Sequence, residues 1–171
     1  MKELLNTLRL QHQTILKMLN QPELVRDLIH FVEQEHHPLE ELELFPFLRT
    51  QRCLHEGGPR CTFFMGVRLE LDPLGVMQNH LKTFYTKTSF RPKNYPVPDW
   101  LTLQSPLSIP FEEHVIGADL AQSILFLLEP ENAHLHQEFF QLLYDDYCRL
   151  LKMHIDKEDG CLFIMCERVL T

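Results

Sequence analysis

The sequence predicts an all-α fold, namely a four-helix antiparallel bundle with a long proline-rich insertion between the second and third helices. Apolar residues recur at helical spacing in four long segments, and no segment alternates apolar and polar residues as a strand would. The links within each pair of segments are short, and most of the prolines lie between the two pairs, in residues 49–110. With 171 residues, the chain fits one domain, residues 1–171.

The first pair of helices is expected over residues 2–20 and 22–48. Pro22 separates them, because the residue before a proline is pushed out of the helical region and proline itself suits a first helical turn. Pro38 lies inside the second helix and lacks a backbone donor. We therefore expect a kink or distorted turn beside the two histidines that precede it.

The insertion, residues 49–110, carries one short helix over 72–86, with Asp72 as its cap and Pro73 in its first turn. Residues 87–110 are expected to be irregular. A segment this long inside a compact domain is usually functional. Our hypothesis is that the insertion packs over one end of the bundle or mediates homodimerisation, through the aromatic residues Phe63, Phe64, Phe84, Phe90 and Trp100.

The second pair of helices is expected over residues 110–128 and 132–168, with the break at Pro130. The apolar stripe of the third helix contains His114, and that of the fourth contains His154 and Glu158.

The overall composition excludes several function classes. The formal net charge is -8, from 24 Asp and Glu against 16 Lys and Arg. Duplex nucleic acid and anionic membranes both reward clustered cations, so neither is an expected partner. No apolar run approaches the ~18 residues that span a bilayer, and the N-terminus turns polar too early for a secretory signal. We therefore expect a cytoplasmic protein.

The five cysteines are odd in number, which does not favour a disulfide scaffold. We interpret them as reduced thiols packed as small hydrophobic residues. A zinc site built from Cys53, His55 and Cys61 is the alternative, although no Cys-x-x-Cys pair supports it.

Two segments of the chain resemble each other: HHPLEELELFP, residues 36–46, and HIDKEDGCLFI, residues 154–164. Each has a histidine, an acid four residues later, a second acid directly after it, and then Leu-Phe. A His and a Glu at this spacing share one helix face. Because both pairs lie on apolar stripes, where an unpaired charge is costly, Glu40 and Glu158 need a cation.

Each duplicated unit also follows a helix with one histidine on its stripe. An antiparallel hairpin brings His12 to the height of His36, and a second hairpin brings His114 near His154. Four imidazoles and two carboxylates can hold two metal ions bridged by the carboxylates. The predicted ligands are His12, His36, Glu40, His114, His154 and Glu158.

Other His-x3-Glu pairs receive different interpretations. We interpret His134 and Glu138 as a solvated pair, and His37 and Glu41 as residues that support the ligands or lie at the surface. The rival to the whole site is a structural bundle whose histidines are ordinary core residues.

The motifs LRLQHQTI, HHPLEELELFP, EEHVIG and HIDKEDGCLFI, in this order, resemble those of the hemerythrin-like (HHE cation-binding) di-iron proteins. The resemblance covers residues 1–48 and 110–168. It implies a hemerythrin-like four-helix bundle and the same six ligands, with Glu40 and Glu158 bridging two iron ions and an oxo, hydroxo or water bridge between them.

The sequence departs from the family pattern in several places. Gln11 replaces the usual acid before the first histidine, and Ile164 replaces the last proline. His114 follows a glutamate and precedes Gly117 as the family motif does, whereas His80 is the alternative third-helix ligand or an additional one. The fifth histidine of the oxygen-carrying hemerythrins, from a His-x3-His pair on the third helix, is missing.

Mixed imidazole and carboxylate ligands suit iron, manganese or zinc and disfavour calcium and magnesium. The resemblance implies three functions: binding or sensing of O₂ or NO without catalysis, which we favour; an oxidoreductase acting on O₂, NO or peroxide, or an iron-handling protein that repairs iron–sulfur centres; and an interaction module whose metals only hold the bundle together.

Overall fold

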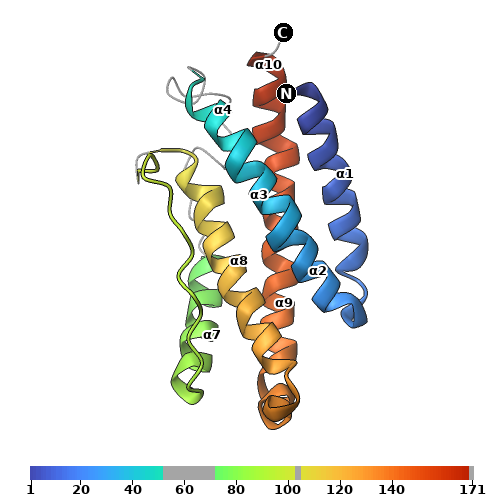
Figure 1. Ribbon diagram of the computed structural model, residues 1–171, viewed down its shortest axis with the longest axis vertical. Helices are drawn as coiled ribbons and strands as arrows, with labels where there is room; N and C mark the ends of the chain where they lie inside the picture. The colour runs from blue at the N-terminus through green and yellow to red at the C-terminus, as the bar shows by residue number, and fades with distance from the viewer. Residues whose placement is uncertain (52–71, 103–104, 170–171) are drawn as a thin grey trace.

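The computed structural model describes residues 1–51, 72–102 and 105–169. Within these ranges all regular elements are helices and no strand occurs, so the predicted all-α class is confirmed there. The described helices form five rods (Figure 1), of which one is helix α7 (Pro73–Lys87) of the insertion.

The first two rods form an antiparallel hairpin. Helix α1 (Lys2–Met18) ends in a tight turn in which the Gln21 N–H donates to the Met18 carbonyl. The second rod then rises through η1 (Pro22–Leu24), α2 (Val25–Phe31), η2 (Val32–His36), α3 (His37–Leu39), η3 (Glu40–Leu44) and α4 (Phe45–Arg49). The predicted helix boundaries at residues 20, 22 and 48 therefore fall within two residues of the observed ones.

The distorted turn expected near Pro38 consists of two π-helical turns, η2 and η3, on either side of α3. In η2 the His37 N–H donates to the Val32 carbonyl, and in η3 the Phe45 N–H donates to the Glu40 carbonyl, so each bond spans five residues. Because proline offers no N–H, the regular ladder is interrupted here. Such π turns are frequent at functional sites.

The other long hairpin consists of α8 (Ser108–Leu127) and a rod made of η4 (Pro130–Asn132), α9 (Ala133–Lys157), η5 (Glu158–Leu162) and α10 (Phe163–Val169). Helix α8 packs closely against α9. A third π turn, η5, closes with the Phe163 N–H donating to the Glu158 carbonyl. The beginning of α1 and the end of α10 lie at the same end of the molecule (Figure 1).

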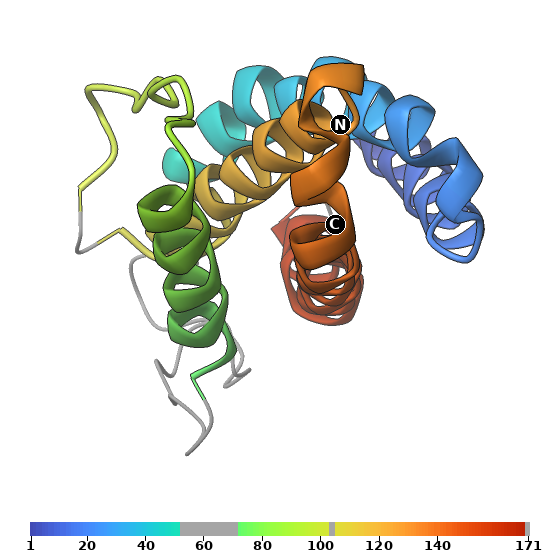
Figure 2. The same ribbon diagram turned by 90° about the horizontal axis from the view of Figure 1, so that it is seen from below.

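The described part of the insertion lies along the side of α8 and α9. Helix α7 (Pro73–Lys87) begins as predicted, with Asp72 accepting a hydrogen bond from the Gly75 N–H. Phe84 is fully buried against Phe126 and Phe139. Seen from below, α7 and α1 occupy opposite flanks of the molecule (Figure 2). The role of the insertion in homodimerisation stays a prediction, and Phe63 and Phe64 lie outside the described residues.

The irregular residues 88–102 run beside α8 (Figure 1). The Lys93 N–H donates to Oε1 of Gln122 at 2.7 Å, and the Tyr95 ring meets Phe111 edge to face. The guanidinium of Arg49 lies 5.4 Å from the centre of the Trp100 ring. These contacts attach the segment to the helical rods.

A layer of buried polar residues separates two hydrophobic clusters. In the orientation of Figure 1, the lower cluster contains Ile15, Val32, Leu120 and Tyr147. The upper cluster, nearer the two termini, contains Leu8, Leu44, Phe45, Leu162 and Phe163. Along α1, the second rod, α8 and the α9–α10 rod, the chain passes from one cluster to the other through a buried His or a His and Glu pair. The Leu-Phe dipeptides of the two duplicated motifs thus meet in one cluster.

Two further expectations concern the cysteines and membranes. Cys148 and Cys166 are reduced, but Cys161 is disulfide-bonded, so the expectation of reduced thiols is wrong at this position. The alternative zinc site of Cys53, His55 and Cys61 lies outside the described residues. None of the described helices combines the length and the apolar character needed to cross a bilayer.

Candidate metal centre

Seven ionisable side chains form the polar layer, and each is at most 2% exposed to solvent: His12, His36, His37, Glu40, His114, His154 and Glu158. They come from four different rods. The six predicted ligands are all among them. Burying two carboxylates at this depth is costly unless a cation or several hydrogen-bond donors compensate.

The Glu40 carboxylate lies between two pairs of imidazoles. Its Oε1 is 3.9 Å from His12 Nε2 and 3.6 Å from His36 Nε2. Its Oε2 is 3.3 Å from His114 Nε2 and 3.7 Å from His154 Nε2. Each oxygen therefore faces a different pair of imidazole nitrogens, as a carboxylate that bridges two ions requires.

The Glu158 carboxylate links the same two pairs. Its Oε2 lies 3.3 Å from Nε2 of His12 and 3.3 Å from Nε2 of His154. Two groups of potential ligand atoms, each within 4.8 Å of one another, share both glutamates: His12, His36, Glu40 and Glu158, and Glu40, His114, His154 and Glu158. These buried groups could each hold a metal ion.

The outward nitrogen of each predicted imidazole ligand has a hydrogen-bond acceptor. The Nδ1 atoms pair with Asp159 Oδ1 (His12, 3.0 Å), Gln11 Oε1 (His36, 3.0 Å), Glu41 Oε1 (His114, 2.7 Å) and Glu113 Oε2 (His154, 3.0 Å). Because carboxylate and amide oxygens only accept, Nδ1 carries the proton and Nε2 is directed at the glutamates. This arrangement of supporting acceptors is typical of metal-bound histidines.

The acceptors are themselves held in place. Tyr95 donates to the Glu41 oxygen that receives His114, at 2.6 Å. The ammonium of Lys157 pairs with Glu113. The supporting residues therefore connect the site to the 88–102 segment and to the surface of α9.

The inward-facing atoms lack partners. Nε2 of His12 and His36 and all four carboxylate oxygens of Glu40 and Glu158 are buried without a hydrogen bond. An unsatisfied buried polar atom costs about 1–3 kcal/mol, so such a cluster requires an explanation. Nε2 of His114 and Nε2 of His154 lie 3.3 Å apart, close to the separation of two nitrogens bound at about 2.1 Å to one ion. The donor set fits a transition metal.

The four predicted imidazole ligands differ in the direction in which their pKa is shifted: it is raised in two of them and lowered in the other two. Burial disfavours the cation at His12, but Asp159 and Glu158 outweigh it and raise its pKa to about 9. Glu158 and Glu113 likewise raise the pKa of His154 well above its ordinary value against the effect of burial. Burial lowers the pKa of His36 to about 4, and burial together with His37 lowers that of His114.

The Glu40 carboxylate stays ionised. Burial would raise its pKa, but the surrounding imidazoles, His36 first and then His154, hold it well below its usual range. The negative Glu40 carboxylate therefore lies next to imidazoles of which two, His12 and His154, have a raised pKa and hold protons. Metal ions that bind here must displace those protons.

The other histidines are distributed as follows. His80 is outside the cluster, because its Nδ1 pairs with Asp146 Oδ2 at 2.7 Å in the contact between α7 and α9. His134 and Glu138 are exposed as predicted, but Glu138 forms its ion pair with Lys87. Glu41 has the predicted supporting role, whereas a surface position for His37 is wrong, since it is 2% exposed and grouped with His114 and His154.

The supporting role of Gln11, Glu113 and Asp159 was not predicted from the sequence. A signal was present: Glu41 and Asp159 are the second acids of the duplicated motifs, and Gln11 and Glu113 directly precede the lone histidines. Which acceptor reaches which imidazole depends on how the rods approach one another, and the local pattern does not contain that information.

Comparison with known proteins found no matching family model, no matching curated protein and no matching solved structure.

Proposed function

We propose that the protein is a non-haem di-iron protein of the hemerythrin-like type, in which Glu40 and Glu158 bridge two ions. His12 and His36 would bind one ion, and His114 and His154 the other. The observation that carries this proposal is that the two oxygens of Glu40 face different pairs of imidazole nitrogens, at 3.3–3.9 Å. The four rods other than α7 would form the antiparallel four-helix bundle of that family.

We further propose that the centre binds a small diatomic ligand, O₂ or NO. Six protein ligands are too few to fill two six-coordinate ions, even with both carboxylates bridging, so positions remain for an exogenous ligand. A cavity of about 650 Å³ lies between the second rod, α8 and the 88–102 segment, and Glu33 and Tyr95 are among its lining residues. Glu33 Oε1 is 3.7 Å from His37 Nδ1, so the cavity adjoins the polar layer through Glu33.

Metal analysis tests the centre itself. The purified protein should bind close to two iron ions per chain, and His36→Ala and Glu158→Ala should each lose at least one. His134→Ala, an exposed histidine outside the cluster, is the matched control and should keep both. Full metal content in the two cluster variants would refute the assignment.

Absorption spectra of the reduced iron protein, before and after O₂ or NO, test the ligand. A reversible adduct supports gas binding. Rapid oxidation with peroxide turnover supports the oxidoreductase alternative. Two bound ions without any spectral response would leave the metal-stabilised interaction module as the better account.

A further inference from the structure

His37 is the one member of the polar layer without a part in the proposed centre. It is 2% exposed, and its Nδ1 is buried without a hydrogen bond. The nearest carboxylate oxygen, Glu33 Oε1, is 3.7 Å away, too far for a hydrogen bond. A buried imidazole in this condition needs either a proton partner or a metal ion.

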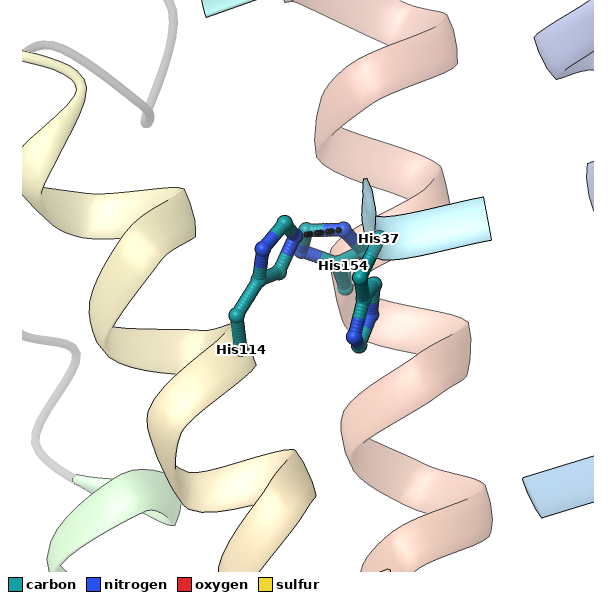
Figure 3. A group of neighbouring side chains, drawn as sticks. All are labelled: His37, His114 and His154. Atoms are coloured by element: carbon teal, nitrogen blue, oxygen red, sulfur yellow. Dashed lines mark hydrogen bonds between the residues drawn. The ribbon is translucent and has the colours of Figure 1, made fainter. Parts of the chain in front are cut away.

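The position of the His37 ring favours a metal ion. One of its nitrogens lies within 4.8 Å of a ring nitrogen of His114 and of His154. The ring also stacks on His114, with centroids 3.9 Å apart and planes 17° from parallel, and meets His154 edge to face. Because a metal ion binds in the plane of an imidazole ring, His37 has to turn out of this stack to bind the same ion as His114. Figure 3 shows the three imidazoles, from three rods, next to one another, with the contact between His114 and His154 dashed.

A comparison of the two duplicated motifs shows that only the first has a histidine directly after its predicted ligand histidine. In the first motif His37 directly follows the predicted ligand His36, and in the second motif Ile155 directly follows the predicted ligand His154. Ile155 is buried in the lower hydrophobic cluster. The fold therefore accepts an aliphatic side chain at residue 155, directly after the ligand histidine of the second motif. Packing in the duplicated motif does not by itself require a histidine at the position that His37 occupies in the first motif.

The local backbone explains how neighbouring histidines reach two different ions. Side chains that follow one another on a helix point about 100° apart, and the π turn η2 ends at His36. His36 Nε2 thus faces Glu40 Oε1, while the His37 ring faces α8. Opposite it on α8 is Gly117, where an added Cβ would lie 3.8 Å from His37 Cε1.

We infer that His37 is a seventh protein ligand and binds the ion held by His114 and His154. This inference rests on the proposed di-metal centre. It makes the two ions unequal: one has three imidazoles, and the other, held by His12 and His36, has two. The adjacent residues His36 and His37 then each bind a different ion.

Selective ¹⁵N labelling of histidine in the zinc-loaded wild-type protein tests this assignment without a mutation. Zinc is diamagnetic, and a metal-bound ring nitrogen has a shift distinct from those of free or protonated nitrogens. We expect one metal-bound nitrogen in His37, as in the four other ligand histidines, and none in His80 or His134. A His37 ring with two unbound nitrogens would overturn the inference.

His37→Ile provides the second test, because it installs the residue that the chain itself packs at the equivalent position. We expect the dissociation constant of one of the two ions to rise about tenfold or more, since even supporting residues of metal sites contribute that much. The other ion should keep its affinity within about threefold. His30→Ile, an exposed histidine on the same rod, is the control and should match the wild type.

The outcomes separate the two proposals. A wild-type protein that fails to bind two ions overturns both of them. A wild-type protein that binds two ions, together with a His37→Ile variant of unchanged affinity and unchanged helicity, overturns only the role of His37. If the variant does not fold, the wild-type ¹⁵N spectrum decides.

Discussion

Nδ1 of His114 and Oε1 of Glu41 lie 2.7 Å apart, and this hydrogen bond joins α8 to the second rod. The counterpart is the bond of His12 to Asp159, from α1 to the π turn that precedes α10. Each second acid of the duplicated motifs thus orients the lone histidine of the opposite hairpin. The supporting contacts tie the two hairpins together through the same residues that position the imidazoles.

Glu41→Leu should weaken metal binding. The variant removes the acceptor of His114 and of Tyr95, so the imidazole loses its orientation and part of its basicity. We expect a loss of about 10–100-fold in metal affinity, measured by competition with a chelator. Glu43→Leu, an exposed position on the same rod, should leave the affinity unchanged, and an equal loss there would contradict the role of Glu41.

Gln11→Glu and Glu113→Gln exchange the acceptor types of the two halves. A carboxylate is a stronger acceptor than an amide and makes the imidazole a better ligand. Gln11→Glu should therefore strengthen metal binding through His36, and Glu113→Gln should weaken it through His154, by about threefold to tenfold each. Competition titrations measure both. Changes of the same sign in the two variants would speak against this explanation.

Removal of the metal should destabilise the protein. A ligand that binds only the folded state stabilises it by about 2.7 kcal/mol at a free concentration one hundred times its dissociation constant. For a chain of this length we expect Tm to fall by about 5–10 °C on chelation, measured by calorimetry. Glu158→Ala should show a smaller drop, because it has already lost an ion.

The tyrosines should remain protonated in alkaline solution. Burial and then Glu33 raise the pKa of Tyr147 well above its ordinary value, and burial and then Glu41 do the same for Tyr95. Since the free phenol has a pKa of about 10, the unfolded chain releases these protons first. Stability is therefore constant below about pH 10 and falls above it, by about 1.4 kcal/mol per pH unit for each phenol.

Absorbance at 295 nm checks this expectation. The increase that marks phenolate should coincide with the loss of helicity at alkaline pH. Full ionisation of the four tyrosines near pH 10, while the helicity is intact, would show that the phenols are not protected by the fold.

Phe84→Ala should destabilise the whole domain. The ring is fully buried against Phe126 of α8 and Phe139 of α9, and such truncations cost about 3–5 kcal/mol. Urea denaturation measures the change. Val76→Ala, at a 40% exposed position of the same helix, should cost far less. A Phe84 variant as stable as the wild type would mean that α7 is not part of the common core.

The sequence predicted the helical segments closely, because apolar spacing and prolines are local signals. It also selected the six histidines and glutamates that the structure brings together, since the duplicated motifs place them on apolar stripes. Pro38 predicted a distortion in the second rod, but neither its π type nor the π turn η5 was predicted, because a repeat of 3.6 residues does not reveal a bond that spans five.

Of the two predicted positions of His37, only the surface one was wrong, for a related reason. On a regular helix, a residue next to a ligand points about 100° away from it, which suggested a supporting or surface position. The surface position is wrong because α8 approaches that side of the second rod and encloses the His37 ring. Likewise, the insertion was expected to pack over one end of the bundle, but its described helix α7 lies along the side of α8 and α9, where Phe84 is buried.

The polar layer crosses the domain at mid-height, and each of four rods passes through it once. Each of the two hydrophobic clusters therefore ends at the polar layer, which contains ionisable side chains. Metal ions bound in this layer would connect the two hydrophobic clusters. Metal affinity and the cooperativity of unfolding would then depend on the same residues.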